Sequence, residues 1–318
     1  MGSRVSVENI AEAAEIIDPV FRDTPQFVSE PLSELFGATV VLKVETVNPI
    51  RSFKGRGTDY LLHRIEVPDA GLVCASAGNF GQGLAYAGRK HGHRVVVFAA
   101  ENATPLKVER MRRLGAEVVL AGHDFDAAKD FARKRAEETG ATFIEDGAEP
   151  PIAEGAGTIA VELCRMEESL DAIYVALGDG ALIGGVGAWM RRAAPATRVI
   201  GVVAEGAPAM QLSWRAGRVV ETESTSTIAD GIAVRAPIAE SFADMKGVVD
   251  DVVAVSEAGI VEAMRMLFAH AGLATEAAGA AGLAALHGAG DAIKGKRVAV
   301  IVTGGNLAAD QRRLLLEG

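Results

Sequence analysis

The sequence predicts an α/β protein in which parallel sheets are covered by helices. Short apolar runs, such as 95–99 and 297–302, have the length of strands and show little alternation of polar and apolar residues. This pattern is typical of strands that are buried on both faces. Segments of helical length follow most of these runs. The chain has 318 residues, of which 49% are hydrophobic, so it can bury a large core in one or two domains.

Strand-like and helix-like segments alternate along most of the chain. In the first half we expect strands at 40–44, 72–76, 95–99, 117–121 and 143–145, and helices at 57–65, 81–91, 106–114, 125–139 and 157–166. In the second half we expect strands at 172–177, 198–204, 252–255 and 297–302, and helices at 183–192, 257–271 and 308–315. Ser256 is the expected cap of the helix that follows it. Segment 205–250 shows no regular pattern.

Composition excludes several classes of protein. The net charge of −10 disfavours a broad surface for nucleic acid or anionic lipid. No run of about 18 uncharged apolar residues is present, so no transmembrane helix is expected. Glu8, Glu12 and Glu15 stand where a signal peptide would be apolar. Cys74 and Cys164 give no disulfide framework or metal-ligand spacing, and both are expected to be buried free thiols. We therefore expect a cytoplasmic protein that binds neither nucleic acid nor membrane.

The first segment whose residues could take part in a reaction is Ser52-Phe53-Lys54-Gly55, at the start of an expected helix. A helix N-terminus disfavours a cation and so favours the neutral amine, which is the form that makes a Schiff base. Most lysines are solvated surface residues, and this segment taken alone does not outweigh that reading.

Two Gly-rich turns each follow an expected strand and open a helix. In Ser76-Ala77-Gly78-Asn79-Phe80, small residues let backbone amides converge on an anion such as a carboxylate. In Gly178-Asp179-Gly180-Ala181-Leu182, free amides and the helix dipole suit a phosphate. This second turn lacks both the Lys-Ser/Thr ending of a nucleotide P-loop and the dinucleotide spacing. Either turn could also be a plain connection between a strand and a helix.

The fourth segment is Thr303-Gly304-Gly305-Asn306, which ends the expected strand 297–302. A hydroxyl group at the end of a buried strand needs a hydrogen-bond partner. A neutral ring nitrogen would be suitable, and a nearby backbone group is the alternative.

In this order the four segments resemble the fold-type II pyridoxal-phosphate enzymes, within them the threonine/serine dehydratase and serine racemase group. Further matching patches at 157–160, 229–233 and 276–282 extend the resemblance over roughly residues 10–307. The resemblance implies a two-domain fold similar to tryptophan synthase β. Residues 1–70 and 148–318 would form a large cofactor-binding domain, and residues 71–147 a small domain that closes over the substrate. It also implies a homodimer.

The resemblance assigns roles to individual residues. Lys54 would carry pyridoxal 5′-phosphate as a Schiff base and move the Cα proton of the substrate. Phe53 would pack near the cofactor ring, Asn79 would bond its 3′-oxygen, and Thr303 would bond its nitrogen. The amides of the phosphate loop are those of Gly178, Asp179, Gly180, Ala181 and Leu182, and further cofactor contacts fall on Gly231 and Glu276. The substrate contacts are Ser76, Ala77, Gly78, Asn79 and Phe80.

The implied activity is that of a dehydratase (ammonia-lyase). It would convert L-threonine, L-serine or a related β-hydroxy amino acid to a 2-oxo acid and ammonia. A threonine hydroxyl cannot keep the ring nitrogen protonated as a carboxylate would, which favours prompt loss of a β-leaving group. Ala77 offers a methyl group where the racemases of the family place a serine hydroxyl. The alternatives are an amino-acid racemase, a β-replacement enzyme and a non-catalytic cofactor-binding module.

Three positions depart from the family pattern. Asp179 places a carboxylate in the phosphate loop, and its side chain is expected to point away from the phosphate. Phe80 replaces the histidine of many relatives, which would make the substrate pocket more apolar. Gln211 stands where relatives that bind a divalent cation near Glu205 have an aspartate, so no metal site is expected there.

Overall fold

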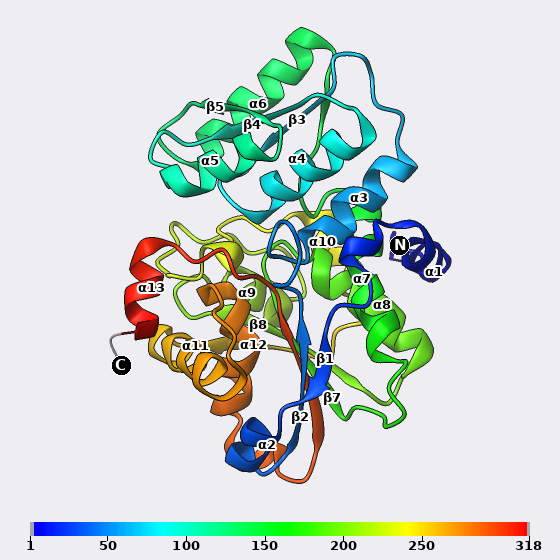
Figure 1. Cartoon of the computed structure of the whole chain (residues 1–318), viewed down its shortest axis with the longest axis vertical. Coiled ribbons are helices and arrows are strands. Elements are labelled where there is room, and N and C mark those ends of the chain that lie inside the picture. The colour runs from blue at the N-terminus through cyan, green and yellow to red at the C-terminus, as the bar shows by residue number, and fades with distance from the viewer. Residues whose placement is uncertain (1–2, 317–318) are drawn as a thin grey trace.

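The computed structural model describes residues 3–316 and has two bodies, each built around its own sheet (Figure 1). The larger sheet has six strands in the spatial order β1 (Gln26–Val28), β2 (Thr39–Val44), β10 (Arg297–Val302), β7 (Ala172–Ala176), β8 (Arg198–Ala204) and β9 (Asp251–Val255). Neighbouring strands run parallel, except that β1 is antiparallel to β2. The smaller sheet is wholly parallel, in the order β5 (Glu117–Leu120), β4 (Val95–Ala99), β3 (Leu72–Ala75) and β6 (Thr142–Phe143).

Helices cover both sheets. They are α1 (Val7–Ile16), α2 (Glu30–Phe36), α3 (Lys54–Arg64), α4 (Asn79–His91), α5 (Pro105–Arg113), α6 (Phe125–Thr139), α7 (Pro150–Leu163), α8 (Ala181–Ala193), α9 (Ala209–Ala216), α10 (Ala239–Asp244), α11 (Glu257–Ala271), α12 (Ala277–Gly288) and α13 (Ala309–Leu316). In Figure 1, α4, α5 and α6 flank the smaller sheet. Among the described residues, no helix has the length and apolar character needed to cross a bilayer.

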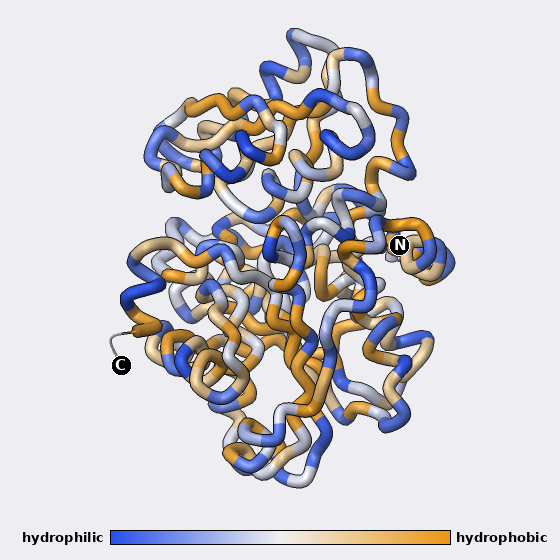
Figure 2. Tube along the Cα trace, in the orientation of Figure 1, coloured by the Kyte–Doolittle hydropathy of each residue, from blue (hydrophilic) through white to orange (hydrophobic). Residues whose placement is uncertain are grey.

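The strands form the centre of the core. All residues of β4 and β7 are buried, and only the first residue of β10 is not. Figure 2 shows hydrophobic residues concentrated along the central strands of the larger body, with hydrophilic residues toward its outside. The predicted α/β class with parallel-rich sheets covered by helices is confirmed.

Several predicted boundaries were wrong. The helix expected at 157–166 begins at Pro150 and ends at Leu163. It starts at Pro150 and Pro151 because proline suits the first turn of a helix. The helix expected at 57–65 begins at Lys54. Helices α1, α2 and α12 were not predicted, and the segment 205–250 contains α9, α10 and a short 3-10 turn at Asp230–Ile232.

The cysteines differ from each other. Cys74 lies buried in β3, as predicted. Cys164 is exposed, so the prediction of a buried thiol was wrong there. It is the C-cap residue of α7, and its Sγ lies 3.8 Å from Met190 Sδ.

Candidate active site

Three adjacent strands of the larger sheet place the predicted site residues at one edge. Lys54 begins the helix that follows β2, Gly178 follows β7, and Thr303 directly follows β10. Because β2, β10 and β7 are neighbours and run parallel, their carboxyl ends lie together, the usual position of ligands in open α/β sheets.

A cavity of about 580 Å³ lies at this edge and reaches the smaller sheet. It brings together every predicted site residue: Phe53, Lys54, Ser76, Ala77, Gly78, Asn79, Phe80, Gly178, Asp179, Gly180, Ala181, Leu182, Gly231, Glu276 and Thr303. Segments more than 200 residues apart in the chain therefore share one cavity, which is the size of a small-molecule site.

Lys54 is the first residue of α3, and its side chain is 16% exposed. Its Nζ forms an ion pair with Asp146 and lies 4.8 Å from the centroid of the Phe53 ring. The amine is thus held on an aromatic face and a carboxylate, and it remains accessible from the cavity.

Asp146 was not predicted as a site residue. It lies in the loop after β6, close to the carboxyl end of a parallel strand, and this position was the one signal in the sequence that could have identified it. Its Oδ2 accepts the hydrogen bond from Lys54, while Oδ1 is buried without a partner in the described part of the chain. Asp179 completes the pair of carboxylates near Lys54. Burial and the charge of Asp146 raise the pKa of Asp179 above its usual range, and Lys54 opposes them.

The loop before α8 provides a row of free amides. Within residues 3–316, the backbone N–H groups of 178–182 donate no hydrogen bond. Gly180 has φ +100°, a backbone conformation that glycine adopts without strain. A methyl group at Gly178 would lie 2.9 Å from the carbonyl oxygen of Gly231. Glycine at these two positions therefore allows a tight loop whose amides and helix dipole suit an anion.

Asn79 is held by a buried polar network. Its Nδ2 donates to Glu276 Oε1 at 2.5 Å, and its Oδ1 accepts from Asn306 Nδ2 at 2.7 Å. Glu276 Oε2 in turn accepts from the amide of Asn306 at 3.2 Å. Burial and the charge of Asp230 raise the pKa of Glu276 to about 7. A methyl group at Gly304 would lie 2.0 Å from Glu276 Oε1, so this network requires glycine there.

The turn before α4 is organised by Ser76. Its Oγ accepts from the amides of Gly78 and Gly81, at 3.1 and 3.0 Å. The amide of Ser76 itself is bonded to Phe98 in β4. In the described chain the amides of 77, 79 and 80 donate no hydrogen bond, so these, rather than the Ser76 amide, are open to an anion.

Thr303 has a weakly engaged hydroxyl group. Its Oγ1 lies 3.5 Å from the carbonyl oxygen of Ala278, at the limit of a hydrogen bond. Its own carbonyl accepts from the amide of Phe53 at 3.1 Å. The site thus offers an amine, a row of amides, an asparagine and a spare hydroxyl, and these groups fit an aldehyde-bearing ring with a phosphate.

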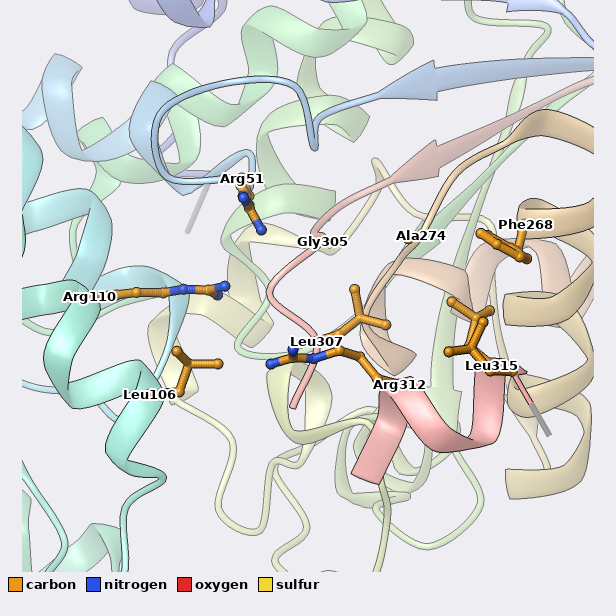
Figure 3. Close-up of a pocket in the computed structure, with 10 residues that line it drawn as sticks. Arg51, Leu106, Arg110, Phe268, Ala274, Gly305, Leu307, Arg312 and Leu315 are labelled. Carbon is orange, nitrogen blue, oxygen red and sulfur yellow. The ribbon is translucent and has the colours of Figure 1, made fainter. Parts of the chain in front are cut away.

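A second cavity of about 460 Å³ lies outside this site, between α5 and α13. Figure 3 shows Arg51, Arg110 and Arg312 extending toward it, with leucines around them. Burial and the two neighbouring arginines lower the pKa of Arg110. Arg110 donates to Asn306 Oδ1 at 2.6 Å, so the cavity shares one asparagine with the Asn79 network.

Comparison with known proteins agrees with this geometry. A family model described as "Pyridoxal-phosphate dependent enzyme" matches residues 17–304. The chain is 37% identical to L-threonine ammonia-lyase of Thermotoga maritima, over 95% of this chain and 76% of that protein. It is 33% identical to L-threo-3-hydroxyaspartate ammonia-lyase of a Pseudomonas species, over 98% and 99%. The structure of processed threonine deaminase isoform 2 from Solanum lycopersicum has a TM-score of 0.91 at 29% identity, covering 100% of this chain and 90% of that one.

Proposed function

The chain belongs to the ammonia-lyase family of pyridoxal-phosphate dependent enzymes, and we propose that it converts a β-hydroxy amino acid, such as L-threonine or L-serine, to a 2-oxo acid and ammonia by α,β-elimination. One observation carries the proposal. Lys54 opens a helix inside the same cavity as the free amides of 178–182 and the Asn79 side chain.

Bound pyridoxal phosphate supplies an electron sink for the electrons of the substrate Cα–H bond. In our proposal Lys54 Nζ anchors the cofactor and, when released, takes the Cα proton. Asp146 accepts a hydrogen bond from Nζ and so orients the amine for this transfer. A well-placed base of this kind contributes roughly 10²–10⁴-fold in rate.

The surrounding residues hold the cofactor in this proposal. The amides of 178–182 and the N-terminus of α8 bind the phosphate. Asn79 binds the 3′-oxygen, Thr303 the ring nitrogen, and Phe53 packs near the ring. Gly231 and Glu276 complete the contacts, since Gly231 lies against the loop and Glu276 fixes Asn79. The raised pKa of Asp179 lowers its charge, which reduces repulsion of a phosphate dianion.

The substrate carboxylate would lie at the turn before α4. The unbonded amides of 77, 79 and 80 suit an anion, and Ser76 and Gly78 keep the turn in shape. Ala77 carries no proton donor, which supports elimination over racemisation. Phe80 is 5% exposed and lines the cavity, so it favours a substrate with an apolar β-substituent. We propose that residues 71–147 form a small domain that closes over the substrate, and residues 1–70 with 148–318 the large domain.

The first test is a substrate panel. Purified, cofactor-loaded protein is offered L-threonine, L-serine and L-threo-3-hydroxyaspartate, and 2-oxo acid release is measured beside the D-amino acid formed. We expect 2-oxo acid from at least one member and no D-amino acid. Lys54→Ala is expected to lose the Schiff-base absorbance and at least about 10²-fold of the activity. Lys246→Ala, an exposed lysine that contacts the Phe242 ring, is the matched control and should behave as wild type.

Two results would contradict this proposal. One is the absence of 2-oxo acid from every substrate while the absorbance is present, which would leave racemisation or β-replacement. The other is normal turnover by Lys54→Ala. We also propose a homodimer, as the family resemblance implies, and a cytoplasmic location, as the composition suggests; sedimentation of the purified protein measures the mass of the assembly.

A further inference from the structure

A cluster of potential metal ligands lies away from the candidate active site, where the C-terminal parts of α3 and α4 meet. Asp59 and His63 are one turn apart on α3, and His91 is the last residue of α4. His91 Nε2 lies 2.9 Å from Asp59 Oδ1, and His63 Nε2 lies 3.7 Å from Asp59 Oδ2. One ligand atom from each residue lies within 4.8 Å of the other two.

We propose that Asp59, His63 and His91 bind a divalent transition metal such as Zn²⁺, which ties α3 to α4. Imidazole nitrogen and carboxylate oxygen are preferred zinc ligands, at about 2.0–2.2 Å from the metal. Atoms of a tetrahedral shell with those bond lengths lie roughly 3.3 Å apart. The distances from the two histidines to Asp59, 2.9 and 3.7 Å, lie on either side of that value, and the three ligand atoms lie within 4.8 Å of one another. Three protein ligands leave a fourth position for water.

The electrostatics of the cluster favour a cation. The Asp59 side chain has no exposed surface, and its Oδ2 also accepts from the amide of Asp18 at 2.7 Å, which fixes the carboxylate. The histidine side chains are 32% and 18% exposed, so an ion can reach them from solvent.

Lys90 competes for this carboxylate. Its Nζ lies 3.2 Å from Asp59 Oδ1 and 3.2 Å from Asp18 Oδ2. A doubly charged ion attracts the Asp59 oxygens more strongly than an ammonium group, and Lys90 can keep its second partner, Asp18. Lys90 Nζ also lies 3.4 Å from Asp59 Oδ2, so metal binding would replace its contacts with both Asp59 oxygens, while its ion pair with Asp18 remains.

The position of the cluster gives it a mechanical consequence. Helix α3 begins at Lys54 and α4 begins at Asn79, and each helix follows a strand of a different sheet. The two helices pack closely, since a methyl group at Gly83 would lie 2.9 Å from Thr58 Oγ1. A metal at the far ends of these helices would fix their relative orientation and link the two bodies of the molecule.

The test uses the holoenzyme after dialysis against a chelator. Zn²⁺ binding is measured by calorimetry, and Co²⁺ binding by the visible bands of a four-coordinate ion. We expect one Zn²⁺ per chain and a higher melting temperature with zinc. His63→Ala and His91→Ala should each weaken binding by at least about 10–100-fold, the range for losing even a supporting residue of a metal site. Lys90→Met should tighten binding, because the competing cation is gone.

His123→Ala is the matched control, since this histidine is 86% exposed and has only Asp124 beside it. His63→Gln and His91→Gln replace the alanine variants if those lose the Schiff-base absorbance and so do not fold. Unchanged zinc affinity in the His63 and His91 variants would overturn the proposal, as would the absence of stoichiometric binding by wild type. Because no proposed catalytic residue is altered, 2-oxo acid release tests the ammonia-lyase proposal separately.

Discussion

A buried arginine in the first turn of α3 lies close in sequence to the candidate catalytic lysine and stabilises this end of the helix. Arg56 follows Lys54 by two residues, and its side chain has no exposed surface. Its guanidinium donates to both oxygens of Glu45, at 2.8 and 3.0 Å, and to both oxygens of Glu162, at 2.6 and 3.0 Å. Burial disfavours the cation, but the two glutamates outweigh burial and raise the pKa of Arg56. Arg56→Met would leave both carboxylates buried, with Lys43 as their remaining cation.

The loss of stability expected for Arg56→Met can be worked out from the pKa of Glu162. Burial raises its pKa, but hydrogen bonds and charge from Arg56, aided by Lys43, lower the pKa from 4.5 to about 2. At about 1.4 kcal/mol per pKa unit, this shift corresponds to roughly 3 kcal/mol of stabilisation at neutral pH. Removing one partner of a buried ion pair costs about 3–5 kcal/mol. The two figures agree, and we expect Arg56→Met to lower the free energy of unfolding by about 3–5 kcal/mol at pH 7.

The pH dependence has a defined sign. A depressed carboxyl pKa contributes stability above the unfolded value of 4.5, and this contribution is lost as the pH falls toward 2. The difference between wild type and Arg56→Met should therefore be largest near pH 7 and smaller at pH 4. Urea unfolding of the holoenzyme, followed by circular dichroism at both pH values, measures it.

Arg64→Met is the matched control for this experiment. Arg64 ends the same helix, is 36% exposed at the side chain and pairs with Glu12, so its loss should leave the free energy of unfolding nearly unchanged. A cost below about 1 kcal/mol for Arg56→Met at pH 7 would refute the reasoning. Equal costs at pH 7 and pH 4 would show that Glu162 is not the group concerned.

Two further predictions concern the cofactor site and its support. Glu276→Gln removes one of the two acceptors that face Asn79 and Asn306, so Asn79 is held less firmly. Because Asn79 is proposed to bind the cofactor, the affinity for the cofactor should fall about 10-fold in an absorbance titration. The affinity of the wild type for the cofactor should also fall as the pH drops through about 7, because the Glu276 carboxylate gains a proton there and keeps only one acceptor. Glu276→Gln should lack this pH-dependent fall. If the fall persists in the variant, Glu276 is not the group that titrates. Gly185→Ala places a methyl group 1.9 Å from the Ala153 carbonyl between α8 and α7, which should cost about 1–3 kcal/mol in urea unfolding. An unchanged urea midpoint would show that the two helices separate easily.

Buried parallel strands and capped helices were the most predictable parts of the fold. The predicted ends of β4, β8 and β10 agree with the structure, because β4 is a continuous apolar run and β8 and β10 are each one arginine followed by such a run. Two helices, α6 and α11, also agree at both ends. Asp124 and Ser256 explain the starts, since their side chains accept hydrogen bonds from the first turn of each helix, and Gly140 and Gly272, which adopt the left-handed conformation, explain the ends.

Helix α12 escaped prediction because it has no polar face. Helix α12 is buried from Ala277 to Leu286, so its sequence has no helical alternation of polar and apolar residues, and its Ala and Gly content reads as a loop. Contacts between residues that are distant in the sequence also could not be predicted. Asp146 meets Lys54, and His91 meets Asp59, across two sheets, and nothing in the local sequence pairs them.

The candidate site depends on a strand order that no local pattern specifies. The last strand, β10, lies between β2 and β7, so Thr303 from the end of the chain meets Lys54 from its beginning. A bridge between Ser52 and Gly304 joins the two loops directly. The motifs predicted which groups the site would contain, because each follows a strand at its carboxyl end. Their convergence required the insertion of β10, so the site can assemble only when the final strand has entered the sheet.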